Sequence, residues 1–185
     1  MRNLLTTAFL LTATALFAKP TLVLEVAGEH EGTVKIELRD DLAPKHVERI
    51  VTLAKDGAYD GIVFHRVIED FMAQTGDVQF GKMGDDTSRA GSGGSDLGNI
   101  DAEFSKETFD KGVVGMARSQ DPNSANSQFF IMLAPGAFLD GQYTIVGKVI
   151  EGQDVVDMIK KGDAKKNGMI DGEADYIKSA TITDE

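Results

Sequence analysis

Residues 63–77, VFHRVIEDFMAQTGD, are rich in β-branched and aromatic side chains but also carry an arginine and a glutamine. The stretch reads as two short strands joined by a tight turn. Because side chains alternate along a strand, Phe64 and Arg66 share one face of the first strand, and Met72 and Gln74 share one face of the second. Arginine is charged at any working pH and is not a nucleophile. Arg66 and Gln74 together suggest chemistry that needs a hydrogen-bond donor held in a fixed position.

Two later segments add residues of the same kind. In SQFFIML, residues 127–133, Gln128 and Phe130 share a face, and further on Phe138 and Leu139 precede a turn that leads to Tyr143. Taken one at a time, the apolar residues are explained by core packing and Arg66 by a surface position on a strand. Only the combination suggests a site.

Rotation about an X-Pro bond is a reaction that needs only such groups. Its barrier is roughly 18–20 kcal/mol because twisting destroys the amide resonance. In the twisted state the proline nitrogen regains its lone pair, so a protonated donor aimed at that nitrogen binds this state best. An apolar pocket would hold the pyrrolidine ring, a glutamine would hold the neighbouring carbonyl, and no nucleophile would be required.

Other chemistries lack their motifs. The histidines His30, His46 and His65 have no zinc-type spacing, and Asp85-Asp86 lacks the spaced ligands of a calcium loop, so no metal is expected. We expect His46 to be solvated and His65 to be structural. Residues 91–98, GSGGSDLG, lack the Lys-Ser/Thr of a phosphate loop and indicate a flexible surface loop. A GxSxG hydrolase motif is missing from the sequence.

The composition is that of a soluble globular domain, with 185 residues, 42% hydrophobic and 26% charged. Thirty acidic against nineteen basic residues give a formal charge of −11, which repels phosphate backbones, so nucleic acid is not an expected partner. The sequence has no cysteine, which excludes disulfides and thiolate catalysis.

The first twenty residues, MRNLLTTAFLLTATALFAKP, combine Arg2 with an uncharged apolar run from Leu4 to Ala18. This pattern predicts a signal peptide over residues 1–18, followed by a mature domain over 19–185. A buried core helix and an uncleaved anchor are the alternatives. The run falls short of the roughly 20 residues that span a bilayer. We expect a periplasmic or secreted protein without stable membrane insertion after cleavage.

The remaining pattern predicts about eight short strands and two helices. Asp40 or Asp41 could cap a first helix that starts near Pro44 and ends before Gly57, with a second helix over residues 152–162. Residues 78–112 form an unusually long connection, which suggests a function or an order imposed by packing. Short antiparallel strands with turn signals favour a barrel whose ends the helices cap. Strands are expected at 21–26, 33–38, 61–77 (two), 112–118, 127–133, 143–150 and 176–183.

Four segments, in this order, resemble the cyclophilin family of peptidyl-prolyl cis-trans isomerases. They are FHRVIEDFMAQTGD, GVVGMAR, NSANSQFFIML and FLDGQYTIVGKVIEG, and the similarity runs from about Thr21 to Thr183. The resemblance implies a mainly β fold, a closed eight-stranded antiparallel β-barrel capped by two α-helices. It also implies that no cofactor is used.

The resemblance assigns site residues by position. It makes Arg66 the catalytic residue and Gln74 and Gln128 polar contacts, while Ala117 and Arg118 offer a backbone edge to the substrate. Arg118 stands where many members carry asparagine. The proline pocket would be lined by Phe71, Met72, Phe130 and Leu139.

Several positions depart from the best-known eukaryotic pattern. Phe138 replaces a tryptophan that the resemblance links to cyclosporin binding, so weak cyclosporin inhibition is expected. Tyr143 replaces a histidine at the pocket wall, and its ring can still pack on proline. Glu69-Asp70 replaces a Pro-Gly turn, and Thr75 replaces a glycine.

The favoured hypothesis is therefore a monomeric isomerase that assists the folding of exported proteins. Its partners would be proline-containing unfolded or flexible polypeptides. A proline-binding module or holdase is the alternative from another class, and a small-molecule carrier is a third. Arg66 separates them, because binding a proline ring does not require a guanidinium.

Overall fold

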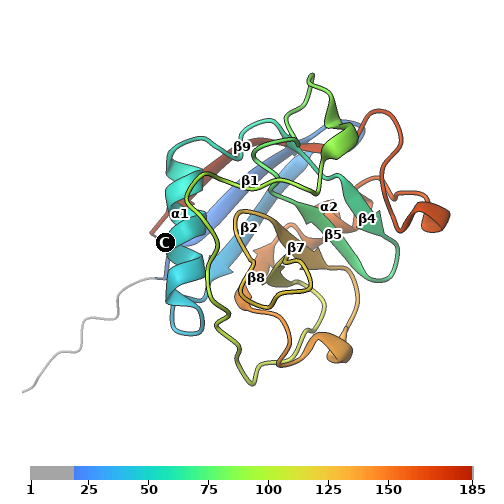
Figure 1. The fold of residues 1–185 in the computed structure, drawn as a ribbon. Coiled ribbons are helices and arrows are strands. Elements are labelled where there is room, and N and C mark those ends of the chain that lie inside the picture. Colours follow the sequence, from blue (N-terminus) through green and yellow to red (C-terminus); the bar gives the residue numbers. More distant parts are fainter. Residues whose placement is uncertain (1–18, 185) are drawn as a thin grey trace, which may run out of the picture.

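The computed structural model describes residues 19–184, so the predicted signal peptide lies outside the described residues. Within this range a single antiparallel sheet of nine strands is accompanied by two α-helices and three 3-10 turns (Figure 1). The strands are β1 Thr21–Ala27, β2 Gly32–Leu38, β3 Ile62–Val63, β4 Arg66–Ile68, β5 Met72–Thr75, β6 Val113–Met116, β7 Phe129–Met132, β8 Ile145–Glu151 and β9 Tyr176–Thr183. The helical elements are α1 Pro44–Lys55, η1 Thr87–Arg89, η2 Ala137–Leu139, α2 Gln153–Met158 and η3 Ala164–Lys166.

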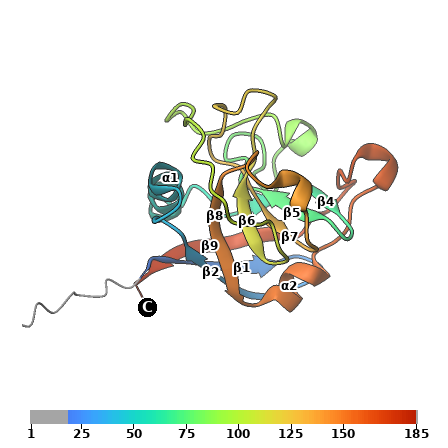
Figure 2. The ribbon, with the colours of Figure 1, turned by 90° about the horizontal axis from the view of Figure 1, so that it is seen from below.

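The sheet curls into roughly a half-barrel, with the strand order β3-β9-β1-β2-β8-β6-β7-β5-β4 (Figures 1 and 2). The expected closed eight-stranded barrel is wrong. The two edge strands, β3 and β4, are consecutive parts of one extended run and cannot pair with each other. Between them, Phe64 N–H donates to Asp175 O at 2.8 Å and His65 O accepts from Ile170 N–H at 3.1 Å, so this stretch binds the segment that precedes β9.

Alternating residues of β5 and β7 enter two separate hydrophobic clusters. Ala73, Phe129 and Ile131 belong to the large cluster inside the curled sheet. Met72 and Phe130 belong to a smaller cluster on the other face, together with Leu139 and Ile145 among others. The period of two in a strand therefore predicts correctly which residues face the proposed site.

The helix α1 is capped by a residue that the local sequence does not reveal. Its N-cap is Ala43, and neither Asp40 nor Asp41 makes the predicted side-chain cap. Instead the Glu103 carboxylate, from the long connection between β5 and β6, accepts from the backbone N–H groups of Lys45 and His46 at 3.3 and 3.1 Å. A carboxylate at this helix end also complements the helix dipole.

The prediction of a solvated His46 is wrong. Its side chain is fully buried, and Nδ1 lies 2.6 Å from Glu103 Oε2. Burial lowers the pKa of His46 below its ordinary value, although the Glu103 carboxylate opposes the shift. The charged neighbours in sequence suggested exposure, but the long connection folds back over this face of the helix.

The two helices lie apart on the curled sheet (Figures 1 and 2), and buried residues of both, Ile50 of α1 and Val156 of α2, belong to the same large hydrophobic cluster. The second helix, α2, is shorter than predicted, and Val155, Val156 and Ile159 are buried as expected. Across residues 19–184, no helix combines the length and the hydrophobicity needed to cross a bilayer.

Candidate active site

A row of paired residues across four strands forms the base of the site. Arg66 on β4 pairs with Gln74 on β5, and Gln74 pairs with Phe130 on β7. Cross-strand partners project from the same face, so these three side chains lie side by side. The row ends on β6 at Gly115, where a Cβ atom would lie only 2.5 Å from the Phe130 ring. Glycine at this position therefore leaves room for that ring.

A cavity of about 370 Å³ opens above this row. It brings together every site residue that the sequence suggested except Gln128, and it adds Gln142. Their roles in catalysis stay predictions. The lining consists of Arg66, Phe71, Met72, Gln74, Ala117, Arg118, Phe130, Phe138, Leu139, Gln142 and Tyr143.

The apolar part of the cavity has a buried floor and an exposed rim. Met72, Phe130 and Leu139 are buried, whereas Phe138 is 66% exposed. The Phe138 ring packs on Phe71 with a centroid distance of 5.4 Å. A floor of this kind suits a small apolar ring, which gains free energy by leaving water.

Phe71 reaches this cavity because it lies in a turn and not in a strand. A strand that included Phe71 would put its side chain on the face opposite Met72, but β5 begins only at Met72. The turn that replaces Pro-Gly is closed by Phe71 N–H donating to Ile68 O at 3.1 Å. Asp70 takes φ +56°, a left-handed conformation that aspartate tolerates better than most residues.

The guanidinium of Arg66 is held by neutral acceptors. Nη1 donates to Gln74 Oε1 at 3.1 Å, while Nε and Nη2 donate to the backbone and side-chain oxygens of Asn167 at 2.9 and 3.1 Å. Nη1 also lies 3.9 Å from Met72 Sδ. Burial lowers the pKa of Arg66 below its ordinary value, but a guanidinium remains protonated at any working pH. Its oxygen partners within residues 19–184 are amide carbonyls, so its charge stays available to a substrate.

Gln74 connects this arginine to a second hollow. Its Nε2 donates to Gln128 Oε1 at 3.0 Å, and Gln128 Nε2 donates to Gly93 O at 2.8 Å. The second hollow, of about 500 Å³, is lined by polar residues that include Gln128 and residues 91–96. Gln74, Ala117 and Arg118 line both spaces. Gln128 thus lines the neighbouring hollow and reaches the 370 Å³ cavity only through Gln74.

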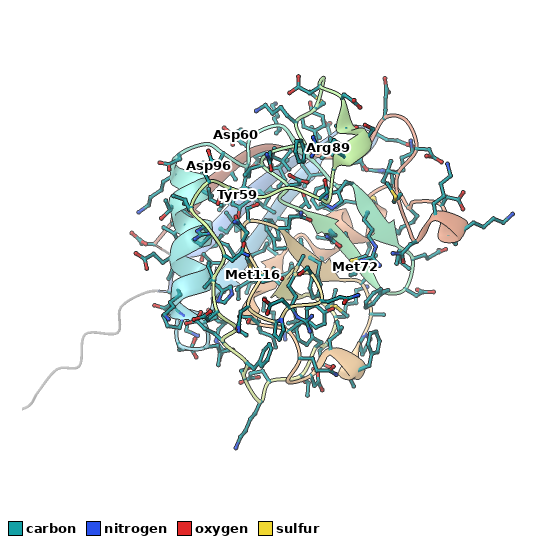
Figure 3. All side chains as sticks on the ribbon, viewed as in Figure 1. Tyr59, Asp60, Met72, Arg89, Asp96 and Met116 are labelled. Atoms are coloured by element: carbon teal, nitrogen blue, oxygen red, sulfur yellow. The ribbon has the colours of Figure 1, made fainter. Side chains whose placement is uncertain are left out.

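The loop over this second hollow is held by the Asn126 side chain, which bonds to Ser95 and Gly98, and by the buried carboxylate of Asp77. Asp77 accepts from the backbone N–H groups of Gly91 and Gly93 at 2.7 and 2.9 Å. In Figure 3 the segment between Arg89 and Asp96 lies above Met72, on the side of α1. The segment 91–98, expected to be a flexible surface loop, therefore forms a wall beside the site.

Arg118 lies at the boundary between the two spaces and packs on Tyr143, which lines only the 370 Å³ cavity. The Arg118 guanidinium carbon lies 4.3 Å from the centroid of the Tyr143 ring, a cation–π contact. Nε and Nη2 of Arg118 donate to Gln142 O at 3.3 and 2.9 Å. Tyr143 also packs edge-on against Phe130, with centroids 5.8 Å apart. Tyr143 therefore forms part of the wall of the cavity, the position that the resemblance gave it.

His65, which precedes Arg66 in sequence, is buried in the protein and does not line the 370 Å³ cavity. It is only 8% exposed, and neither ring nitrogen has a hydrogen-bond partner. Burial lowers its pKa to about 4, so the ring is neutral at physiological pH. In the part of the chain that the structure describes, no group of three or more potential metal-binding side chains comes together.

Sequence reasoning missed two residues of the site. Gln142 lines the cavity and fixes the rim, because its Nε2 donates to Phe138 O at 2.8 Å. Asn167 binds Arg66 from 101 positions away. The dipeptide Asn167-Gly168 is a turn signal in the sequence, but nothing local relates it to β4.

Comparisons with known proteins agree with this geometry. The family model for cyclophilin type peptidyl-prolyl cis-trans isomerases matches residues 21–182. A Brucella suis protein named "probable peptidyl-prolyl cis-trans isomerase" is 57% identical over 173 residues, covering 92% of this chain and 86% of that protein. A peptidyl-prolyl cis-trans isomerase of Schizosaccharomyces pombe is 41% identical over 128 residues, covering 67% of this chain and 76% of the relative.

Solved structures give the same result. A Cryptosporidium parvum cyclophilin type isomerase, crystallised in the presence of the dipeptide Ala-Pro, matches with a TM-score of 0.73 and 28% identity, covering 89% of this chain and 99% of that chain. A Hirschia baltica cyclophilin matches with a TM-score of 0.70 and 27% identity, covering 87% and 73%. The chain therefore belongs to the cyclophilin-type peptidyl-prolyl cis-trans isomerase family, and its enzyme class is that of the peptidyl-prolyl isomerases.

Proposed function

We propose that this protein accelerates X-Pro bond rotation with Arg66 as its catalytic residue and the 370 Å³ cavity as its proline pocket. One observation carries the proposal: a guanidinium held by amide oxygens stands at the edge of a buried apolar floor. A carboxylate partner would have neutralised much of the charge that a substrate could feel.

The mechanism follows from the geometry. The proline ring enters the floor formed by Met72, Phe130 and Leu139, while Arg66 directs an N–H group at the proline nitrogen. That nitrogen accepts a hydrogen bond only when the amide is twisted, so Arg66 stabilises the transition state more than either planar isomer. The donor is fixed before the substrate arrives, which removes the cost of orienting it.

The substrates are proline-containing segments of unfolded or flexible polypeptides. The cavity is open on the side of Phe138, which is 66% exposed, so a chain can pass across it. Crystallisation of the Cryptosporidium relative with Ala-Pro supports a site of this class. The predicted signal peptide supports a role on exported proteins, in the periplasm or outside the cell. Without a catalyst, isomerisation of an X-Pro bond takes tens of seconds or more.

A refolding assay tests the role of Arg66. A proline-limited substrate protein is refolded with wild type, Arg66→Ala and Arg66→Lys. If Arg66 supplies about 3 kcal/mol to the twisted state, Arg66→Ala lowers kcat/KM on the order of a hundredfold. The kcat/KM of Arg66→Lys also decreases, because lysine keeps the positive charge but lacks the planar guanidinium with its several N–H groups. Equal acceleration by all three proteins contradicts the role of Arg66.

Binding measurements on the same variants separate an enzyme from a proline-binding module. An enzyme retains its affinity for an X-Pro peptide in Arg66→Lys while losing turnover. A binder without turnover accelerates refolding in none of the three proteins. Export is tested separately by N-terminal sequencing of the exported protein, where an intact Met1 rules out cleavage.

A further inference from the structure

The catalytic arginine has a second support that comes from the far end of the sequence. Asn167 occupies the Nε–Nη2 edge of the Arg66 guanidinium with two different oxygens, its backbone carbonyl at 2.9 Å and its side-chain carbonyl at 3.1 Å. Gln74 binds the remaining nitrogen, Nη1, at 3.1 Å. Among residues 19–184, Asn167 therefore supplies two of the three oxygen acceptors of this guanidinium.

The two supports bind different nitrogens of the guanidinium, Gln74 at Nη1 and Asn167 at Nε and Nη2. Gln74 lines both the proline pocket and a neighbouring hollow that also contacts Arg66, whereas Asn167 borders that hollow but not the pocket. A guanidinium has five N–H groups, so three bonds to oxygen leave N–H groups on the Nη side for a substrate. The nitrogen Nη1 lies near Met72 Sδ, which marks this side as the one facing the pocket floor.

The segment that carries Asn167 is tied to the strand of Arg66. Val67 N–H donates to Gly168 O at 2.8 Å, and Val67 O accepts from Gly162 N–H at 2.9 Å. A Cβ atom at Gly168 would lie 2.4 Å from the Ile68 side chain, so glycine permits this close approach. These contacts involve the residues directly after Arg66, and they fix where Asn167 stands.

The conformation of Asn167 brings both of its oxygens to the arginine. The residue ends the η3 turn with φ +56° and ψ +35°, in the left-handed region. Asparagine enters this region more readily than most residues. Both oxygens are neutral, so they orient the guanidinium without cancelling its charge.

We propose that Asn167 is a positioning residue of the isomerase reaction, which holds the Nε–Nη2 edge of Arg66 so that its Nη side faces the proline pocket. The inference rests on the proposed catalytic role of Arg66. Asn167 does not touch the pocket, so its loss should disturb turnover and leave the binding of the proline ring intact.

The test uses Asn167→Gly, because glycine keeps the left-handed backbone and the backbone carbonyl while it removes the side chain, and with it the oxygen that binds Nη2. On an X-Pro peptide, kcat falls about tenfold because the arginine loses a fixed orientation, and KM stays within about twofold. Lys166→Ala is the matched control, since Lys166 is exposed in the same turn and pairs with Asp171 at 2.7 Å. It keeps the wild-type kcat, and thermal melting verifies that both variants are folded.

A double-mutant cycle with Arg66→Lys makes the test specific. Lysine cannot present the Nε–Nη2 edge, so Asn167→Gly has no further effect on kcat in that background. The inference is overturned if Asn167→Gly alone keeps the wild-type kcat, or if it lowers kcat by the same factor in both backgrounds. If Arg66→Lys itself keeps the wild-type kcat, the failure lies in the proposed function, and the two failures are thus distinguishable.

Discussion

Arg66 and Gln74 face each other across the pairing of β4 with β5, and Nη1 of the arginine donates to Oε1 of the glutamine at 3.1 Å. The same glutamine donates from Nε2 to Gln128 at 3.0 Å. Both ends of its amide are therefore engaged, and its orientation is fixed by the network around it. A strand pair has placed a donor and its support in direct register, which explains why the two polar residues stand in apolar strands.

Gln74→Ala tests this support from the pocket side. Removing one hydrogen bond to a charged group costs about 1.5–3 kcal/mol where the bond is fully used, so kcat should fall by about tenfold or more. Steady-state kinetics on an X-Pro peptide measure the effect. Gln120→Ala, at an exposed position, is the matched control and should behave like wild type. A Gln74→Ala enzyme with unchanged kcat would show that the glutamine is dispensable.

Phe138→Trp tests the expected weakness of cyclosporin inhibition. The resemblance places a tryptophan at this position in inhibitor-sensitive members, and the exposed Phe138 has no N–H group to donate. An indole adds apolar area and one donor, so inhibition should strengthen about tenfold. Titration of isomerase activity with cyclosporin measures it, with Phe138→Leu as the control that adds no donor. Equal inhibition of Phe138→Trp and wild type contradicts the prediction.

His65 should make the protein less stable as the pH falls from about 6.5 towards 4. Burial lowers its folded pKa to about 4, with Arg66 adding to the shift and the Asp77 carboxylate opposing it. The ordinary unfolded pKa is about 6.5, so the unfolded chain takes up the proton first. The free energy of unfolding is therefore unaffected by this residue above pH 6.5 and decreases by about 3 kcal/mol by pH 4.

Urea unfolding at a series of pH values measures this dependence. Leucine does not titrate, so in His65→Leu the decrease in unfolding free energy between pH 6.5 and 4 should be smaller than in wild type by about 3 kcal/mol. His30→Leu is a comparison at a partly exposed histidine. An identical pH profile for wild type and His65→Leu would show that His65 is protonated equally in both states.

The carboxylate of Asp175 should stabilise the folded state, and this contribution should persist to a pH below the ordinary pKa of aspartate. Burial alone would raise its pKa, but donors that include the N–H groups of Lys160, His30 and Glu29 outweigh burial and lower it. Its stabilisation is thus complete above the unfolded pKa of about 3.9 and is lost as the pH falls through the lower folded pKa.

The variant Asp175→Asn should lose about 2–3 kcal/mol of unfolding free energy at pH 7, because a buried amide cannot accept all these hydrogen bonds. Chemical denaturation measures the loss. Asp171→Asn, at an exposed ion pair with Lys166, is the control and should change stability by less than about 1 kcal/mol. Equal stabilities of the two variants would mean that the carboxylate of Asp175 is not needed.

Local pattern was sufficient for most elements and for most of the cavity. Alternation in FMAQT and SQFFIML puts Met72, Gln74 and Phe130 on one face, because a strand has a strict period of two. The departure at Phe71 arises because a turn residue does not obey that period. The buried face of α1 was likewise predictable, because Val47, Ile50 and Ala54 recur at spacings of three and four residues. The cap of this helix by Glu103 was not predictable, since that contact joins residues 57 positions apart.

The sequence by itself placed Arg66 and Gln74 on two paired strands, because these strands form a hairpin, and strand alternation gave the face of each residue. That Phe130, Leu139 and Tyr143 join them was expected from the resemblance to the cyclophilin family. The tertiary structure decided that the edge strands β3 and β4 do not close the sheet, and that Asn167 binds the Nε–Nη2 edge of Arg66. An open half-barrel in place of a closed one, and Asn167 against the guanidinium, both depend on where distant segments pack. Local propensity carries no information about such contacts, because they arise only when the whole chain is folded.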